Sequence, residues 1–323
     1  MKAVVQDRYG SADVLELTDI DKPVVGSGDV LLRVHAASAH IGDWHVMTGL
    51  PYLLRILGFG FRRPKARVRG MDAAGRVEEI GADVTRFQPG DEVFGIAAGS
   101  FAEYATARDD KIALKPANLS FDQAATVPTS CFAAVQALRD KGEVQPGQKV
   151  LIIGAGGAVG SFAVQIAKAF GAHVTGVCST SKVDLVRSIG ADDVIDYTRD
   201  DFARSGQRYD LILDTAGGRT LSQLRRALTP KGTLVMRSLS TSRSSPFSFE
   251  ASMHSFWPTN GDSMGARRLR SKPPSHRPPP SSPTIEAGKI TPVIDATYPL
   301  SEVPEAIRHL EEGHARGKIV ITV

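Results

Sequence analysis

The chain has 323 residues, of which 42% are apolar and 23% charged, and this composition is typical of a globular protein large enough for two domains. Its formal net charge is +4, but the segment from Arg237 to Thr284 holds seven Lys and Arg against two acids, so the remainder sums to about −1. A general nucleic-acid-binding surface is therefore not indicated.

Targeting and redox signals are weak. The segment from Met1 to Asp7 lacks the apolar core of a secretory signal, and no run of about 18 apolar residues could span a bilayer. We therefore expect a cytoplasmic protein without stable membrane insertion. Two cysteines, Cys131 and Cys178, are too few for a multi-cysteine zinc site or a disulfide framework.

The first 115 residues consist of short β-like runs separated by glycines. These runs occur at 3–6, 30–34, 75–80, 92–94 and 101–106. Few helical stretches lie between them. The rhythm therefore predicts a compact β-rich domain and not a βα repeat.

From residue 148 the pattern changes to alternating strands and helices. Strand-like apolar runs occur at 150–153, 173–177, 193–195, 211–213 and 233–235, with helical spacing at 161–170, 181–189 and 221–228. This alternation predicts a doubly wound parallel sheet of the Rossmann type. After it, Ser301 is a candidate N-cap for a helix that ends at Gly313, and a final strand at 319–323 can pack on the first domain.

One glycine turn indicates a dinucleotide. An apolar strand ends at Ile153, and the G-x-G-x-x-G frame then falls on Ala155, Gly157 and Gly160, with an imperfect first position. Glycines let the backbone approach a pyrophosphate, and the following helix N-terminus offers free N–H groups. The predicted contacts are Ala155, Gly156, Gly157, Ala158, Val159 and Gly160; the alternative is a glycine-rich turn without a ligand.

The end of the next strand bears on the choice of cofactor. An acid about 20 residues past the turn would accept the ribose hydroxyls of NAD, but this strand ends in Cys178-Ser-Thr-Ser-Lys182. Hydroxyls and a cation suit a 2′-phosphate, so Ser179, Thr180 and Lys182 predict NADPH. The alternative is a plain helix cap with the lysine in solvent.

One segment breaks the regular pattern. Residues 238–283 contain thirteen Ser and eight of the 19 Pro. Proline lacks the backbone donor and serine competes for backbone hydrogen bonds, so the composition predicts disorder. Regular patterning stops after Val235 and resumes at residue 285.

Six ordered motifs resemble the medium-chain dehydrogenase/reductase superfamily, most closely its zinc-free quinone oxidoreductase branch, the ζ-crystallin-like proteins. The resemblance covers roughly residues 1–236 and 285–323. The motifs are the glycine turn, Gly75-Arg-Val-Glu-Glu-Ile-Gly81, Val84-Thr-Arg-Phe-Gln-Pro-Gly-Asp-Glu-Val-Phe-Gly95, Ser100-Phe-Ala-Glu-Tyr104, Ala124-Ala-Thr-Val-Pro128 and Gly317-Lys-Ile-Val-Ile321.

The resemblance implies an α/β fold with two domains. A GroES-like catalytic domain would comprise residues 1–120 and 286–323, and a Rossmann NADPH-binding domain residues 121–285. The family also implies a homodimer, formed in part by strands and a helix at the place of residues 238–283. Because this chain re-enters the pattern in mid-helix, we hypothesise that about 237–284 are translated from a wrong reading frame; a natural disordered insertion is the alternative.

The resemblance also assigns site residues. Tyr197 would approach the 2′-phosphate, and Lys318 would lie near the pyrophosphate unless it is a solvated lysine before an edge strand. Thr129 would lie near the nicotinamide. The pocket would be lined by His40, Asp43 and Tyr52, with His40 either a donor to the substrate or a packed or exposed histidine.

Zinc is not expected. By resemblance the three catalytic zinc positions of the alcohol dehydrogenases fall on His40, Met71 and Thr129, and neither Met nor Thr is a suitable ligand. The closely spaced His40, Asp43 and His45 lack further ligands. An apolar run at 50–61, followed by Arg62, Arg63, Lys65 and Arg67, is interpreted either as a substrate lid, which we favour, or as a membrane-touching patch.

Together these features predict an NADPH-dependent, zinc-free reductase acting on quinones, enones or related carbonyl compounds. A zinc-type alcohol dehydrogenase is the rival enzyme. A non-catalytic NADPH-binding protein with an impaired nucleotide domain is the rival from another class.

Overall fold

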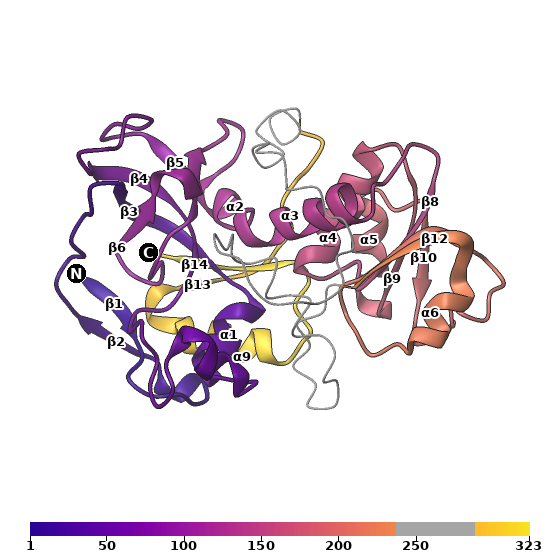
Figure 1. Cartoon of the computed structure of the whole chain (residues 1–323), viewed down its shortest axis with the longest axis horizontal. Helices are drawn as coiled ribbons and strands as arrows, with labels where there is room; N and C mark the ends of the chain where they lie inside the picture. The colour runs from indigo at the N-terminus through magenta and orange to yellow at the C-terminus, as the bar shows by residue number, and fades with distance from the viewer. Residues whose placement is uncertain (237–287) are drawn as a thin grey trace, which may run out of the picture.

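The computed structural model describes residues 1–236 and 288–323, and these form two lobes joined by a row of helices (Figure 1). The predictions of disorder or a frame error over 237–284 concern residues outside those described. The strands are β1 (Lys2–Val5), β2 (Glu16–Asp19), β3 (Asp29–Ala39), β4 (Asp72–Ile80), β5 (Glu92–Ile96), β6 (Tyr104–Arg108), β7 (Ile112–Leu114), β8 (Lys149–Ile153), β9 (His173–Cys178), β10 (Asp193–Asp196), β11 (Tyr209–Asp214), β12 (Leu228–Met236), β13 (Ile294–Pro299) and β14 (Lys318–Thr322).

The described helices are fewer in the first lobe, which holds α1 (Ile41–Thr48) and α9 (Val303–Glu311). The others are α2 (Phe121–Ala125), α3 (Pro128–Val135), α4 (Ala158–Ala169), α5 (Val183–Ser188) and α6 (Leu221–Ala227), with short 3₁₀ or π turns η1 (Ala12–Val14), η2 (Arg55–Phe59), η3 (Asp109–Lys111), η4 (Gln136–Lys141), η5 (Thr180–Lys182) and η6 (Leu300–Glu302).

The first lobe is built on a sheet that joins both ends of the described chain. Its order is β13-β14-β3-β4-β5-β7, and β6 also pairs with β3. β14 runs antiparallel to β3, with Val320 opposite Ser38, so the last strand lies inside the sheet and not at its edge. Figure 1 shows the yellow C-terminal strands running into the indigo N-terminal lobe, as the sequence suggested.

The second lobe is a five-stranded parallel sheet in the order β10-β9-β8-β11-β12. Alternate residues of its central strands face opposite layers: Val150 and Ile152 pack with α4, whereas Leu151 and Ile153 pack with α6. Both faces are therefore covered, which explains why the strand sequences are continuously apolar. The predicted α/β fold, GroES-like lobe plus Rossmann sheet, is confirmed.

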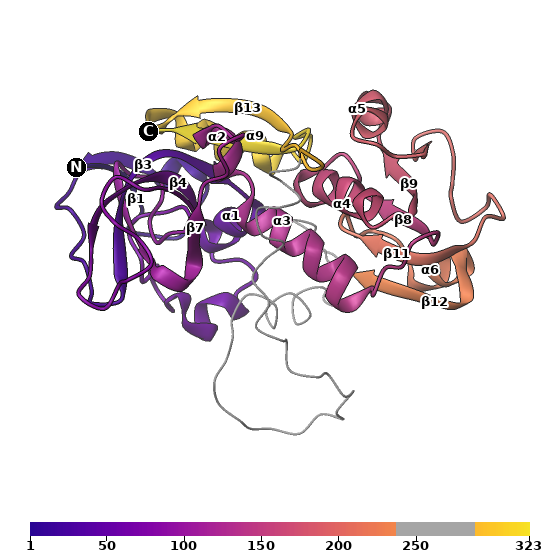
Figure 2. The ribbon, with the colours of Figure 1, turned by 90° about the horizontal axis from the view of Figure 1, so that it is seen from above.

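Helices α2, α3 and α4 lie between the two sheets (Figure 2). One core cluster continues across this junction, since Ala36, Ala74 and Val320 of the first sheet pack in it with Val150 and Phe162 of the second lobe. The boundaries predicted at residues 120/121 and 285/286 stay a prediction. The lobes share a core, so the site that forms between them is held by packing on both sides.

Two local predictions are wrong. Ser301 does not cap a helix: it lies in the turn η6, and α9 begins after Glu302 without a side-chain cap. The strand after Lys318 is not an edge strand. The segment 285–290, where we expected the chain to resume in mid-helix, begins outside the described residues, and its described part, 288–290, contains no helix.

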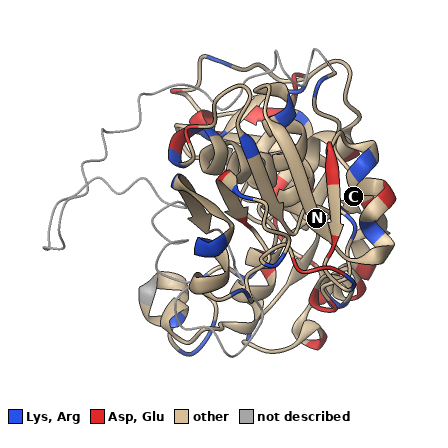
Figure 3. Ribbon diagram, turned by 90° about the vertical axis from the view of Figure 1, so that its right-hand side faces the viewer, with Lys and Arg blue, Asp and Glu red and all other residues tan. Residues whose placement is uncertain are grey.

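Charges of both signs are interspersed over the ribbon seen in Figure 3. Within residues 1–236 and 288–323, no helix is both long and apolar enough to cross a membrane.

Candidate functional site

The glycine turn lies at the carboxyl end of the central strand β8. Its left-handed residue is Gly154, with φ +84°, and not Ala155, whose methyl group is buried. A Cβ added at Gly160 would lie 2.0 Å from the carbonyl oxygen of Gly154. The turn therefore requires glycine at Gly154 for conformation and at Gly160 for the close approach of α4.

This turn fits a pyrophosphate. Gly157 is the N-cap of α4 and supplies no side-chain acceptor, so the N–H groups of Ala158, Val159 and Gly160 have no acceptor inside the helix. The helix dipole adds a favourable potential for an anion. Gly157 also pairs in a parallel bridge with Gly317, which brings the start of β14 beside the turn.

A second loop, which we did not predict, faces the same turn. Asp214 ends the neighbouring strand β11, accepts the N–H groups of Ala216 at 3.0 Å and Gly217 at 2.8 Å, and is 1% exposed. Burial raises the pKa of its carboxyl group. The hydroxyl of Thr215 donates to the carbonyl of Ile153 at 2.8 Å. Since adjacent parallel strands end at one edge, the strand pattern could have indicated this loop.

The predicted ribose-phosphate contacts gather at the end of β9. The Tyr197 N–H donates to the carbonyl of Cys178 at 3.0 Å, and the Tyr197 side chain is 52% exposed. The oxygens of Ser179 and Ser181 lie 3.3 Å apart. Ser179 begins η5 without a side-chain cap, which argues against the plain helix-cap interpretation.

Lys182 lies over the glycine turn and not in open solvent. Its Nζ donates to the carbonyl of Ala315 at 2.7 Å, and its stem is so close to Gly156 that an added Cβ would be 2.9 Å from it. Burial lowers the pKa of the Lys182 ammonium group. The lysine therefore connects the turn to the segment that leads into β14.

An acid does lie beside the predicted ribose-phosphate contacts, although the sequence of β9 offers none there. Asp196 ends β10, which pairs in parallel with β9 so that Asp196 lies opposite Cys178. Its Oδ2 accepts the hydroxyl proton of Thr180 at 2.6 Å. That hydrogen bond lowers the pKa of the Asp196 carboxyl group. The sequence of β9 alone does not reveal this acid, because only the pairing of β10 with β9 brings it there.

A buried hydrogen-bond network centred on Asp72 lies in the first lobe. Asp72 is 0% exposed and accepts from Ser38 Oγ at 3.2 Å, from Thr129 N at 3.2 Å and Oγ1 at 2.5 Å, and from Lys318 Nζ at 3.3 Å. These donors belong to β3, α3 and β14. Lys318 is 1% exposed, so the solvated-lysine interpretation is wrong.

The network was only partly predicted. We named Thr129 and Lys318 for the cofactor, but not Asp72 or Ser38. A single acid inside the otherwise small and apolar run Gly70-Met-Asp-Ala-Ala-Gly75 was the available signal, since a buried carboxylate needs donors.

His40 and Asp43 form a pair at the start of α1. His40 is 5% exposed, so it is not an exposed histidine. Its Nδ1 accepts the N–H of Gly42 at 2.9 Å, and a neutral ring therefore carries its proton on Nε2, which is 3.6 Å from Asp43 Oδ2. This Nε2 is buried without a hydrogen-bond partner among the described residues. Burial raises the pKa of the Asp43 carboxyl group.

Tyr52 is not buried with His40 and Asp43. Its side chain is 68% exposed, and the Arg55 guanidinium lies 4.9 Å from its ring. Across the two described ranges, no group of three or more His, Cys, Asp and Glu side chains is arranged to hold a metal ion.

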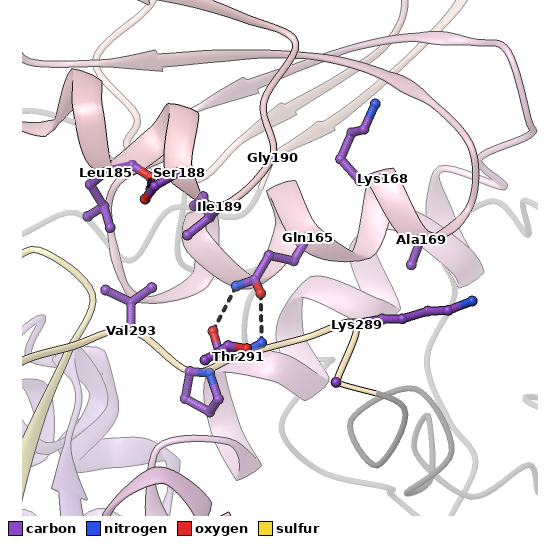
Figure 4. A pocket seen from close by; sticks show the side chains of 12 residues that line it. Gln165, Lys168, Ala169, Leu185, Ser188, Ile189, Gly190, Lys289, Thr291 and Val293 are labelled. Atoms are coloured by element: carbon purple, nitrogen blue, oxygen red, sulfur yellow. Dashed lines mark hydrogen bonds between the residues drawn. The ribbon is translucent and has the colours of Figure 1, made fainter.

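A cavity of about 720 Å³ lies elsewhere and shares no residue with the predicted site. It opens between α4, α5 and residues 288–293, where Gln165 exchanges two hydrogen bonds with the backbone of Thr291, at 3.0 and 2.7 Å (Figure 4). These bonds fasten the described C-terminal segment to α4. The cavity therefore gives no reason to move the candidate site away from the glycine turn.

The first prediction concerns Gly160. Gly160→Ala places a methyl group against backbone, displaces α4 and weakens the binding of a nicotinamide dinucleotide by on the order of tenfold, measured by fluorescence titration with NADPH and NADH. Gly28→Ala is the matched control, because no atom lies within 4 Å of its added Cβ. Unchanged affinity of Gly160→Ala for both dinucleotides would contradict this assignment.

The second prediction concerns Asp43. Because burial raises its folded pKa, the contribution of Asp43 to the unfolding free energy falls as pH rises from about 4, the pKa in the unfolded chain, toward the raised value. Asp43→Asn lacks this dependence. Urea unfolding should show the wild-type minus variant difference declining with pH and then levelling off, with the exposed Asp83→Asn as control. A difference that grows with pH would refute the prediction.

Comparison with known proteins gives consistent matches along the chain. The family model described as alcohol dehydrogenase GroES-like domain matches residues 26–117, and the one described as zinc-binding dehydrogenase matches residues 189–321. The mitochondrial NAD(P)H oxidoreductase RTN4IP1 of Bos taurus is 34% identical over 363 residues, covering 100% of this chain and 89% of that protein.

Two further matches agree. The chloroplastic NADPH-dependent alkenal/one oxidoreductase of Arabidopsis thaliana is 32% identical, covering 99% of this chain and 79% of that protein. The solved structure of the quinone oxidoreductase from Coxiella burnetii matches with a TM-score of 0.80 at 29% identity, covering 100% of this chain and 99% of that one. All three matched proteins are oxidoreductases by name.

Proposed function

The chain belongs to the medium-chain dehydrogenase/reductase superfamily, and on that basis we propose that it is an NADPH-dependent, zinc-free oxidoreductase that transfers hydride to quinones, enones or related carbonyl compounds. The observation that carries the proposal is the donor set around Asp72. At the positions where family resemblance would put zinc ligands, the chain has His40, Met71 and Thr129, and Thr129 already donates to Asp72.

NADPH would be held along the carboxyl edge of the parallel sheet. The N–H groups of α4 and the glycine turn suit its pyrophosphate, and Ser179, Thr180, Lys182 and Tyr197 surround the end where a 2′-phosphate would lie. Asp196 disfavours NADPH. Its carboxylate already accepts the hydrogen bond of the Thr180 hydroxyl and would repel a phosphate. We propose that the Lys182 ammonium outweighs it when the phosphate is present.

NADPH would supply the hydride when bound; the chain would orient the acceptor and stabilise the charge that develops on its oxygen. His40 is suited to this role since its Nε2–H is buried and has no partner among the described residues. Asp43, whose Oδ2 lies 3.6 Å from His40 Nε2, would orient the imidazole ring for this hydrogen bond. Thr129, fixed by two hydrogen bonds to Asp72, would position the nicotinamide side of the pocket.

Among the substrates considered, quinones and enones need the least activation by the enzyme. Their reduction proceeds by hydride addition to an activated double bond, so hydrogen bonds can replace a Lewis acid. The rival is a zinc-type alcohol dehydrogenase, which the match to the zinc-binding dehydrogenase model favours. A zinc-type enzyme would have to bind zinc at the three aligned positions, and of them only His40 is a suitable zinc ligand.

Location and assembly are also proposals. We propose a cytoplasmic homodimer acting on a small-molecule substrate. Relatives named mitochondrial and chloroplastic make fractionation of the native cells the relevant check on location.

The third prediction tests cofactor choice. Lys182→Met should weaken NADPH binding by roughly tenfold and leave NADH nearly unchanged, whereas Asp196→Asn should strengthen NADPH binding severalfold by removing a nearby negative charge. Asp193→Asn, on the same strand, is the control for Asp196. Fluorescence titration with both dinucleotides measures this, and tighter NADH binding by the wild type would refute the NADPH assignment.

The fourth prediction concerns turnover. NADPH oxidation should be seen with members of a quinone and enone panel and not with simple aldehydes. His40→Phe should reduce turnover while keeping NADPH affinity, because it removes the donor to the acceptor oxygen but no cofactor contact. Silence with every acceptor, in protein that binds NADPH, would favour the non-catalytic alternative.

A further inference from the structure

The exposed apolar side chains of this protein are concentrated in one short segment. Of the fourteen large hydrophobic side chains that are exposed among the described residues, five lie within residues 52–61. Ile56 is 69% exposed and Phe61 is 71% exposed. The five are Tyr52, Leu53, Ile56, Phe59 and Phe61. Such a concentration marks an interaction surface, since single exposed hydrophobic residues are otherwise scattered.

The same segment is strongly cationic. No Asp or Glu occurs between Asp43 and Asp72, both of which are buried, whereas six Lys and Arg do. Three are engaged: Arg67 pairs with Asp7, Arg55 donates to backbone carbonyls, and Arg69 is buried. The side chains of the other three, Arg62, Arg63 and Lys65, are exposed and make no hydrogen bond or close ion pair within the described chain. The Arg63 charge contributes to the lowered pKa of Asp7, which is paired with Arg67.

The backbone of the segment is held in place from its inner side. The Tyr9 hydroxyl donates to the carbonyls of Phe59 at 3.0 Å and Gly60 at 2.6 Å, and the Arg55 guanidinium lies 4.2 Å from the Tyr9 ring. The Lys65 N–H donates to the Phe59 carbonyl at 2.9 Å, closing the loop around Gly60, where φ is +109°. The apolar side chains are therefore displayed by a folded protrusion and not by an unsupported loop.

We propose that residues 52–65, here called the 52–65 surface, bind an anionic lipid bilayer. The apolar and aromatic tips would enter the headgroup region while Arg62, Arg63 and Lys65 contact lipid phosphates. Three unpaired cations beside exposed apolar groups, with no acid among them, complement such a surface in both charge and polarity. This attachment is peripheral and reversible, and it is independent of the proposed reaction.

The bilayer accounts for the surface better than the substrate lid favoured from the sequence. A lid should contact the site it covers, but Ile56 and Phe61 are 69% and 71% exposed. The hydrogen bonds that hold the segment run to Tyr9 and to the carbonyls of Thr48 and Gly49, and not to His40 or Asp43. An acidic protein partner would use the cations but would not require so many exposed apolar tips.

The fifth prediction is tested by co-sedimentation of the full-length protein with vesicles of phosphatidylcholine alone and of phosphatidylcholine mixed with phosphatidylserine. The wild type should bind the anionic vesicles, and salt should weaken the binding. Each removed cation should weaken it by roughly fivefold, so R62Q/R63Q/K65Q should lose on the order of 100-fold. I56S/F61S should also release the protein.

Controls are V24S/L114S, exposed apolar residues elsewhere, and K141Q/K231Q, exposed cations elsewhere. Both should bind vesicles like the wild type. Circular dichroism and NADPH titration check folding, and the single variants F61S and R63Q replace any multiple variant that fails to fold. Equal binding to neutral vesicles, binding only to an acidic polypeptide, or variants that bind vesicles normally but raise the KM for the acceptor would each overturn the proposal.

Discussion

The burial of one carboxylate constrains the architecture of this protein. Asp72 is wholly inaccessible, and a buried carboxyl group is tolerated only when hydrogen-bond donors surround it. Its donors come from residues 38, 129 and 318, which lie far apart in the sequence. Removing one partner of such a buried pair typically costs about 3–5 kcal/mol, a large part of the stability of a domain.

This constraint fixes the last strand relative to the nucleotide domain. Lys318 reaches Asp72, and the preceding Gly317 pairs with Gly157 of the glycine turn. Gly317 has φ +104°, and an added Cβ would lie 2.4 Å from the Val293 carbonyl oxygen, so only glycine permits this approach. The adjacent residues Gly317 and Lys318 thus connect the proposed pyrophosphate site to the hydrogen-bond network around Asp72.

The sequence predicted the architecture well where local patterns dominate. Apolar runs of strand length and the change of rhythm near residue 148 predicted both the β-rich lobe and the parallel sheet. Helix starts were less predictable, as Ser301 shows. A 3₁₀ turn precedes α9, and Ser301 lies inside that turn and not at the N-cap of the helix.

Site residues that lie together in one segment of the sequence were predicted. Those that meet only through contacts between several segments were missed. The glycine turn is a local motif, although the left-handed residue proved to be Gly154 and not the expected position. Asp72, Ser38 and Asp196 act through partners on other strands, and only the pairing of those strands brings them to the site. Lys318 was assigned to the cofactor by resemblance, yet its long-range partner Asp72 could not be read from one sequence.

The central claim is that hydrogen bonds from protein side chains, and not a metal ion, support the proposed reaction at this site. The most direct measurement is NADPH oxidation with a quinone or enone acceptor after exhaustive dialysis against a zinc chelator, with the zinc content determined on the same sample. Full activity in zinc-free protein is the result we expect. Loss of activity that is restored by stoichiometric zinc would contradict the claim.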